Sequence, residues 1–235
     1  MPRAPRAAAP GRSADDALRS EAFRVLRSNL EVSLDDLERH CIMITSPSAN
    51  EGKTLTSVNL AASMASTGRR VVLVDLDLRH PDVHMWVDAH NETGATDVLL
   101  GRLALSDCLQ FVSTEQGNGS TTRGFYLLPV GPAVANPAEL LATSRTGRLL
   151  DALGSNADIV LVDAPPVLPV ADSLALARLA GGVIVVVEAG RTTYPQMERT
   201  VQLLARSQAR LLGMVLNRAR EGVSYGYGYP VLSGT

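Results

Sequence analysis

The chain has 235 residues, enough for one sizeable α/β domain but too few for two of ordinary size. Its net charge of −2 excludes the broad basic field that nucleic-acid binding needs, and its 46 % hydrophobic content is typical of a folded protein. No segment holds the roughly 18 consecutive apolar residues of a membrane span, so we expect any membrane association to come through a partner.

The predicted elements follow one another as alternating strands and helices. Residues 1–16, rich in Pro, Ala and Arg, predict a disordered arm, and residues 15–37 have the pattern of an amphipathic helix. Continuous apolar runs then predict buried strands over 41–45, 71–74, 125–130, 159–162, 183–187 and 211–216. Helical patterns lie between them over 54–67, 137–153, 173–179 and 194–207. This alternation predicts a doubly wound, mostly parallel α/β sheet.

A candidate phosphate-binding loop, SPSANEGKT, connects the first predicted strand to the helix that follows it. Its EGKT end matches the close of the GxxxxGK[ST] pattern, and a loop that leads into a helix offers free N–H groups to phosphate. The match is imperfect, because Pro47 and Asn50 stand where glycines are common, although Asn tolerates the left-handed conformation. The expected nucleotide-binding residues are Ala49, Asn50, Glu51, Gly52, Lys53, Thr54 and Leu55.

Lys53 is the only lysine among 22 basic residues, the others all being arginine. A compact ammonium fits among phosphates where a planar guanidinium does not, so this position favours nucleotide binding over a plain polar turn. In a P-loop, Lys53 would reach the β- and γ-phosphates and the Thr54 hydroxyl would ligate Mg²⁺. The chain therefore predicts a fold of the P-loop NTPase type that binds ATP and Mg²⁺.

Carboxylates end two of the predicted strands. Asp75 and Asp77 follow the second strand, where side chains two residues apart point the same way from an extended backbone. Asp163 ends the strand over 159–162, as in a Walker B motif. The carboxyl ends of parallel strands are where ligand sites form in such sheets, so these residues suggest Mg²⁺ binding or proton transfer.

The segment that ends in Asp75-x-Asp77-x-Arg79 closely resembles the Walker A′ motif of the bacterial tyrosine kinases (BY-kinases) of the CpsD/CapB type. Further resemblances extend from about residue 21 to residue 218. They include LPVG and NPAELL within 127–141, AGRTT at 189–193 and GMVLNR at 213–218. Glu21, Arg24 and Arg27 are similar to the family's ExxRxxR helix, which implies a subunit contact in a ring-shaped homo-oligomer.

The resemblance implies phosphoryl transfer from ATP to protein tyrosine, with Lys53, Asp75 and Asp77 as catalytic residues. Asp75 would lie nearest the γ-phosphate and act as base for the tyrosine hydroxyl. Asp77 and Asp163 would hold the waters around Mg²⁺, with Thr54 as a direct ligand. Asn217, at the end of a late strand, is similar to the residue that contacts adenine.

The last residues carry Tyr225, Tyr227 and Tyr229, out of five tyrosines in the chain. By resemblance this cluster implies an autophosphorylation target. We therefore expect an arm over 1–16, a P-loop kinase domain over 17–220 and a flexible Tyr- and Gly-rich tail over 221–235.

The resemblance also implies a role and partners for the chain. The role would be regulation of capsular or exopolysaccharide synthesis and export. The partners would be a membrane-spanning polysaccharide co-polymerase that activates the kinase, and a cognate tyrosine phosphatase. The short arm fits the form of the family in which kinase and membrane protein are separate chains. The kinase would then be cytoplasmic and recruited to the inner face of the plasma membrane.

Two other functions remain open at this stage. A ParA/MinD-like ATPase switch would have the same fold, although Ser48 stands where such proteins carry an early signature lysine. The tail also lacks the basic amphipathic helix of membrane-binding members. The altered P-loop leaves room for a nucleotide-gated regulator of polysaccharide export without kinase activity.

Overall fold

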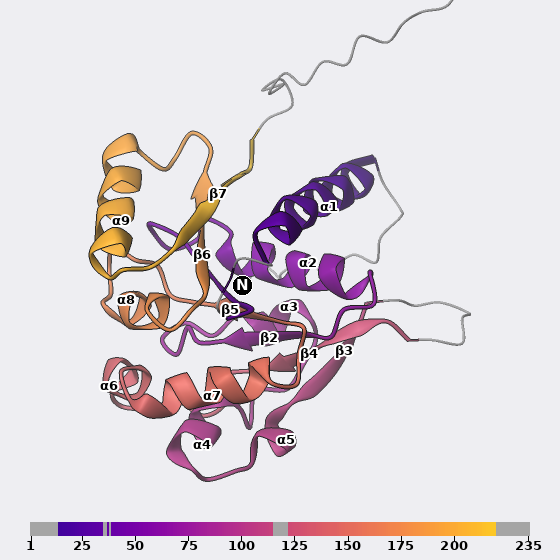
Figure 1. Cartoon of the computed structure of the whole chain (residues 1–235), viewed down its shortest axis with the longest axis vertical. Coiled ribbons are helices and arrows are strands. Elements are labelled where there is room, and N and C mark those ends of the chain that lie inside the picture. Colours follow the sequence, from indigo (N-terminus) through magenta and orange to yellow (C-terminus); the bar gives the residue numbers. More distant parts are fainter. Residues whose placement is uncertain (1–13, 35–36, 38, 115–121, 220–235) are drawn as a thin grey trace, which may run out of the picture.

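The computed structural model describes residues 14–34, 37, 39–114 and 122–219 of the chain (Figure 1). The tail with Tyr225, Tyr227 and Tyr229, and most of the arm, lie outside the described residues. The first helix begins at Ala14, so it includes the last residues of the range assigned to the arm. Within the described stretches, no helix has both the length and the apolarity needed to cross a bilayer.

A seven-stranded sheet in the order β3-β4-β2-β5-β1-β6-β7 forms the centre of the molecule. The strands are β1 (Cys41–Thr45), β2 (Val71–Asp75), β3 (Gln110–Ser113), β4 (Gly124–Leu128), β5 (Ile159–Asp163), β6 (Gly182–Glu188) and β7 (Leu211–Asn217). All neighbours pair in parallel except β3 and β4. The predicted fold class is confirmed. The sequence missed β3 because this short edge strand alternates between half-buried and exposed residues instead of forming an apolar run.

Helices fill the connections between the strands. They are α1 (Ala14–Leu34), α2 (Lys53–Ala65), α3 (Val83–Trp86), α4 (Ala95–Leu100), α5 (Leu105–Cys108), α6 (Pro137–Leu141), α7 (Ser144–Gly154), α8 (Asp172–Ala177) and α9 (Tyr194–Arg206). The prediction of one continuous helix over 137–153 is wrong. Thr143 is extended, and its hydroxyl donates to the carbonyl oxygen of Leu140, which separates α6 from α7.

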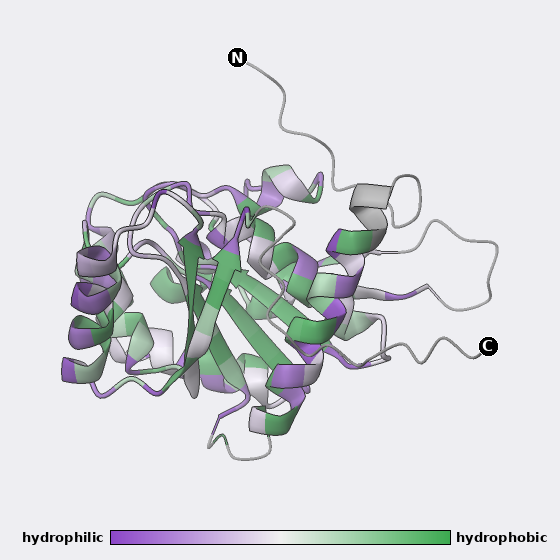
Figure 2. Ribbon diagram, turned by 90° about the horizontal axis from the view of Figure 1, so that it is seen from above, coloured by the Kyte–Doolittle hydropathy of each residue, from purple (hydrophilic) through white to green (hydrophobic). Residues whose placement is uncertain are grey.

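Two hydrophobic clusters pack on the two faces of the sheet. Helices α1, α2 and α3 cover one face, and α4 to α9 cover the other (Figure 1). In β1, Ile42 and Ile44 belong to the first cluster, and Cys41 and Met43 to the second. Figure 2 shows the hydrophobic strands enclosed by helices that carry their polar residues outward. Burial on both faces explains why the strands appear in the sequence as continuous apolar runs.

Strand order and register bring distant motifs to one edge of the sheet. Strand β5 lies between β1 and β2, and all three are parallel, so their carboxyl ends share that edge. Asp75 at the end of β2 is directly opposite Asp163 at the end of β5. The P-loop leaves β1 beside them. The predicted motifs therefore meet at this edge.

Candidate active site

The P-loop has two residues in the left-handed region, Asn50 with φ 65° and Gly52 with φ 96°. The prediction that Asn50 accepts this conformation is confirmed. Gly52 is required for a second reason, because a Cβ atom at this position would overlap the side-chain amide of Asn217. Ala49 and Asn50 form the exposed tip of the loop, and Thr54 is buried at the start of α2.

Lys53 lies between two of the predicted carboxylates. Its Nζ is 2.9 Å from Oδ2 of Asp77 and 3.7 Å from Oδ2 of Asp163. Burial alone would lower the pKa of Lys53, but the charges of Asp163 and Asp77 outweigh it and raise the pKa. The lysine therefore carries a permanent positive charge. To bind phosphate oxygens, its ammonium would give up part of its contact with these two carboxylates.

Asp163 binds the start of α2 through both of its oxygens. The hydroxyl of Thr54 donates to Oδ2 at 2.8 Å, and the hydroxyl of Ser57 donates to Oδ1 at 3.0 Å. Burial is the main cause of a raised pKa for Asp163. Ser57 was not among the predicted site residues. Its signal was its position one helical turn after Lys53, which places both side chains on one face of α2.

Asp75 has a different environment from Asp77, although the two belong to one motif. It is fully buried, and its oxygens accept the main-chain N–H groups of Asp77 at 3.0 Å and Val83 at 3.2 Å. Burial first, and then the charge of Asp163, raise the pKa of Asp75 well above its usual range. Strand β2 ends at Asp75, so the alternation that would align the two carboxylates stops before Asp77.

Asp77 and Arg79 connect the segment after β2 to neighbouring elements. Asp77 accepts the N–H group of His80 through Oδ1 while its other oxygen pairs with Lys53. Arg79 donates from Nε to Oδ2 of Asp172 at 2.8 Å, and Asp172 is buried at the start of α8. The sequence contained no signal for Asp172, because its partner lies far away in the chain.

The donor set fits a magnesium–phosphate group. A buried ammonium, a loop that enters a helix through a left-handed glycine, a threonine hydroxyl and two carboxylates meet at one point. Within the described residues, no three His, Cys, Asp or Glu side chains are grouped as a metal site of their own. Mg²⁺ usually keeps several waters and takes substrate phosphates as ligands, so a hydroxyl with nearby carboxylates suits it.

Asn217 reaches the P-loop from the end of β7. Its amide Nδ2 donates to the main-chain oxygen of Glu51 at 2.9 Å. The predicted adenine-contacting residue therefore lies directly against the phosphate loop. Leu55 is half-buried in the first turn of α2.

The residues predicted for subunit contact separate into two groups on α1. Glu21 and Arg24 pair with each other at 3.0 Å, with both side chains more than half exposed. Arg27 instead points to α2, where its Nη1 donates to the carbonyl oxygen of Ser63 at 2.8 Å. Its Nε lies 3.8 Å from Oε1 of Glu31. Only Glu21 and Arg24 are thus presented outward by this structure.

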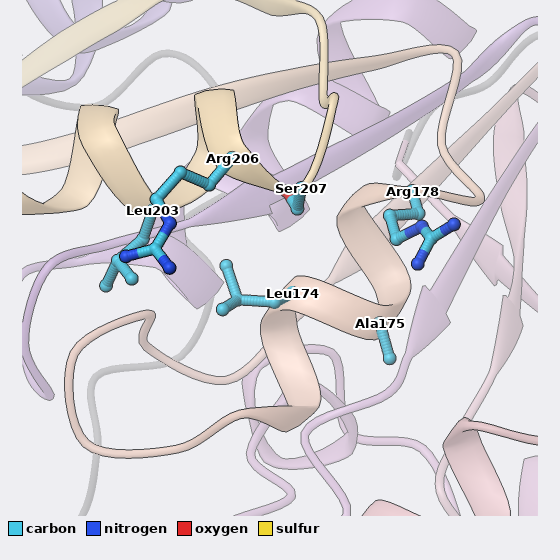
Figure 3. Close-up of a pocket in the computed structure, with 6 residues that line it drawn as sticks. All are labelled: Leu174, Ala175, Arg178, Leu203, Arg206 and Ser207. Atoms are coloured by element: carbon cyan, nitrogen blue, oxygen red, sulfur yellow. The ribbon is translucent and has the colours of Figure 1, made fainter.

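A cavity of about 410 Å³ lies elsewhere, between α8 and α9 (Figure 3). Leu174 and Leu203 line it together with Arg178 and Arg206. None of the predicted site residues lines this cavity. This cavity is thus separate from the sheet edge that carries the predicted site residues.

The sequence profile of the CobQ/CobB/MinD/ParA nucleotide binding domain matches residues 42–228. The chain therefore belongs to this class of nucleotide-binding proteins. Tyrosine-protein kinase YwqD of Bacillus subtilis strain 168 is 34 % identical over 213 residues, which cover 91 % of this chain and 86 % of that protein. Within the class, the chain accordingly belongs to the bacterial tyrosine kinases.

Other relatives differ in length or in the closeness of the match. The tyrosine-protein kinase Wzc of Salmonella typhimurium strain LT2 is 31 % identical, and the match covers 88 % of this chain but only 28 % of Wzc. The kinase domain of Escherichia coli tyrosine kinase ETK has a TM-score of 0.78 and 31 % identity, covering 88 % of this chain and 80 % of that domain. The cell division ATPase MinD of Pyrococcus furiosus is similar in fold alone. Its identity is 21 % and its TM-score 0.63, and the match covers 80 % of this chain and 73 % of MinD.

Proposed function

We propose that this chain transfers the γ-phosphoryl group of ATP to protein tyrosine. The observation that carries the proposal is the pair of carboxylates around Lys53, where the P-loop enters α2. Its Nζ lies 2.9 Å from Oδ2 of Asp77 and 3.7 Å from Oδ2 of Asp163. Membership of the bacterial tyrosine kinases supports tyrosine as the acceptor. Positioned charges of this kind supply most of the catalysis in phosphoryl transfer.

The roles of the phosphate-binding residues follow from their contacts. Lys53 and the N–H groups of residues 49–55 would hold the β- and γ-phosphates, and the Thr54 hydroxyl, now bonded to Asp163, would be the protein ligand of Mg²⁺. Asp77 and Asp163 would hold the waters of the metal. The chemistry supplied by Mg²⁺ would be neutralisation of phosphate charge. Asn217, which lies next to the loop, would contact the adenine.

Asp75 serves as the base for the tyrosine hydroxyl in this proposal. A tyrosine hydroxyl has an ordinary pKa of about 10, so a nearby acceptor is useful at neutral pH. The raised pKa of Asp75 makes it a better acceptor than an ordinary carboxylate. Each oxygen accepts a single main-chain N–H group and so keeps a free lone pair, but Asp75 is fully buried, so the proposal requires neighbouring groups to move when the tyrosine arrives.

The tail tyrosines Tyr225, Tyr227 and Tyr229 are the proposed acceptors, and transfer occurs between subunits of a ring. The outward face of α1 supports self-association. Leu18, Val25 and Val32 are exposed at seven-residue intervals along this helix. The ion pair of Glu21 and Arg24 lies beside this stripe. An apolar stripe flanked by charges is suited to covering by another chain.

The proposed cellular role is regulation of capsular or exopolysaccharide synthesis and export. A membrane-spanning co-polymerase would activate the kinase and recruit it from the cytoplasm to the inner face of the membrane, and a tyrosine phosphatase would reverse the modification. Several relatives support such a role through their names alone, for example the tyrosine-protein kinase in the cps region of Klebsiella pneumoniae. No role in binding nucleic acid is proposed.

The test is incubation of the purified protein with ATP and Mg²⁺, followed by mapping of phosphotyrosine by mass spectrometry. The proposal predicts modification of the tail, and little incorporation in a protein with Tyr225→Phe, Tyr227→Phe and Tyr229→Phe. Undiminished phosphotyrosine in that variant, mapped to Tyr126 or Tyr194, would overturn the tail assignment. Absence of phosphotyrosine in the wild-type protein, both alone and with a membrane fraction that contains the activating co-polymerase, would overturn the kinase proposal.

A second experiment determines whether transfer occurs between subunits. A Lys53→Met protein with an intact tail is mixed with active protein that lacks the tail. Transfer in trans predicts phosphorylation of the Lys53→Met chains. Unmodified Lys53→Met chains alongside normal autophosphorylation of the wild type would show transfer within one chain.

A further inference from the structure

The side chain of Glu51 is buried although it belongs to a surface loop. Only 1 % of the residue is exposed, next to a site proposed to bind a highly charged anion. Within the described residues it forms no ion pair with a basic side chain. A buried carboxylate is costly unless its oxygens accept hydrogen bonds.

Both oxygens of Glu51 have a donor. Oε2 accepts the main-chain N–H of Ser48 at 2.8 Å, which closes the P-loop upon itself across its exposed tip. Oε1 accepts the hydroxyl of Thr192 at 2.5 Å, which ties the loop to another part of the chain. We call these two contacts together the Glu51–Thr192 bridge. The loop tip between Ser48 and Glu51 is thereby held at both ends.

The orientation of the Thr192 hydroxyl is fixed. Its oxygen accepts the N–H of Glu188 at 2.8 Å, so its proton is directed to Glu51. Thr192 lies in the turn between β6 and α9, and the next residue, Thr193, caps α9 together with Gln196. The bridge therefore joins the P-loop to a rigid turn held by a strand and a helix.

The loop needs such support because of its composition. Asn50 holds the left-handed conformation at φ 65°, at a position where many P-loops have glycine. Asn adopts this conformation more readily than other non-glycine residues, but only glycine adopts it without steric cost. The two hydrogen bonds of Glu51 hold the tip in the conformation in which Asn50 is left-handed.

We propose that Glu51 and Thr192 are positioning residues that hold this non-standard P-loop ready for nucleotide. The proposal rests on the nucleotide site described above, because it assigns to the bridge the preorganisation of that site. It also explains how a loop with Pro47 and Asn50 where glycines are common serves the kinase. The bridge acts through the main chain of the loop and touches no reacting atom.

The test is titration of the full chain with ADP in the presence of Mg²⁺, which measures nucleotide affinity without catalysis. Thr192→Val removes the hydroxyl and keeps the shape, and it should raise the Kd about tenfold, a typical effect for a hydrogen bond to a charged group. Thr192→Ser keeps the hydroxyl and should bind ADP like the wild type. Thr200→Val is a matched control, because Thr200 is fully buried on α9 and donates to the carbonyl of Gln196 without contacting the P-loop.

A purely structural role for Thr192 would give a different result. In that case Thr192→Val would lower the unfolding temperature of the nucleotide-free protein as Thr200→Val does, and the Kd for ADP would not change. That outcome would overturn the bridge while leaving the nucleotide site intact. A wild-type protein that does not bind ADP would overturn the nucleotide site itself, so the two failures are distinguishable.

A second substitution tests the reason given for the bridge. Asn50→Gly removes the conformational cost at the tip. It should restore much of the affinity lost in Thr192→Val, and its effect on the Kd for ADP should be larger in that background than in the wild type. If Asn50→Gly has the same effect in both backgrounds, the bridge does not hold the tip in its left-handed conformation, and the proposal is wrong.

Discussion

The sheet edge around Lys53 and the outward face of α1 hold their charged residues in opposite ways. Around Lys53 the charges are buried, and each has a partner from the same chain at a distant sequence position. On α1, Glu21 and Arg24 are more than half exposed and pair only with each other, three residues apart. The first region is complete within one chain, whereas the second presents a surface that a second chain can cover.

This contrast predicts that substitutions in the two regions will change different measurements. Around Lys53 they should reduce catalysis and nucleotide or metal binding in each molecule. On the outward face of α1 they should change the mass of the assembly and leave the fold of each chain unaltered. The expected effects decrease in size from the lysine to the helix surface.

Lys53→Met should give the largest effect. Loss of one positioned charge at the phosphates should reduce phosphotransfer by about 10²–10³-fold. Because the lysine also neutralises Asp77 and Asp163, the circular dichroism spectrum and ADP-free unfolding should be recorded on the same protein. Activity within threefold of the wild type, in a folded variant, would remove Lys53 from the phosphate site.

Asp75→Asn should lower kcat by about 10²-fold, as expected for loss of a general base, and should change the KM for ATP far less. A base must be ionised to accept the proton, and burial raises the pKa of Asp75. Activity of the wild type should therefore fall on acidification at a pH well above the ordinary Asp value of about 3.9. A wild-type kcat that is constant down to that pH would contradict the base role.

Asp77→Asn and Asp163→Asn should mainly weaken the response to Mg²⁺. Groups that hold metal-bound waters typically contribute 10–100-fold to metal affinity, so the Mg²⁺ concentration at half-maximal activity should rise by about that factor. The measurement is a Mg²⁺ titration at saturating ATP. If excess Mg²⁺ fails to restore any activity, the two carboxylates act in the chemical step and not on the metal.

Arg24→Ala and Arg27→Ala should give the smallest effects. They should distinguish the outward face of α1 from the face that packs on α2. Arg24→Ala should alter the free energy of unfolding by less than about 0.5 kcal/mol but shift the mass from light scattering toward monomer. Arg27→Ala should cost about 1–2 kcal/mol through its lost hydrogen bond to the Ser63 carbonyl. An unchanged mass for Arg24→Ala would show that this face does not hold subunits together.

The sequence allowed prediction of the sheet, the P-loop and the carboxylates because each has a local signal. Apolar runs identify buried strands, and Lys53 was conspicuous as the only lysine. The environments of Asp75 and Asp77 could not be predicted, since they depend on where β2 ends and on the N–H groups of later residues. The inward turn of Arg27 likewise required its neighbour on α2.

The contacts of Glu51 show most clearly what the sequence cannot provide. Glu51 was predicted to be a nucleotide-binding residue through its place in the P-loop, but the pattern leaves position 51 variable and gives no indication of what its side chain contacts. Its partner Thr192 is 141 residues away in the chain and is brought close by the pairing of β1 with β6. Contacts that depend on two loops at one edge of a sheet become visible only when strand order is known.

The contact between Gly52 and Asn217 restricts which substitutions the chain tolerates at these two positions. The space that a side chain at position 52 would need is already filled by the Asn217 amide. A methyl group at position 52 would displace the Asn217 amide from its hydrogen bond to the Glu51 oxygen unless a smaller residue stood at position 217, and the left-handed φ would still oppose it. The residue tolerated at the start of the first crossover helix therefore depends on the residue at the end of the last strand.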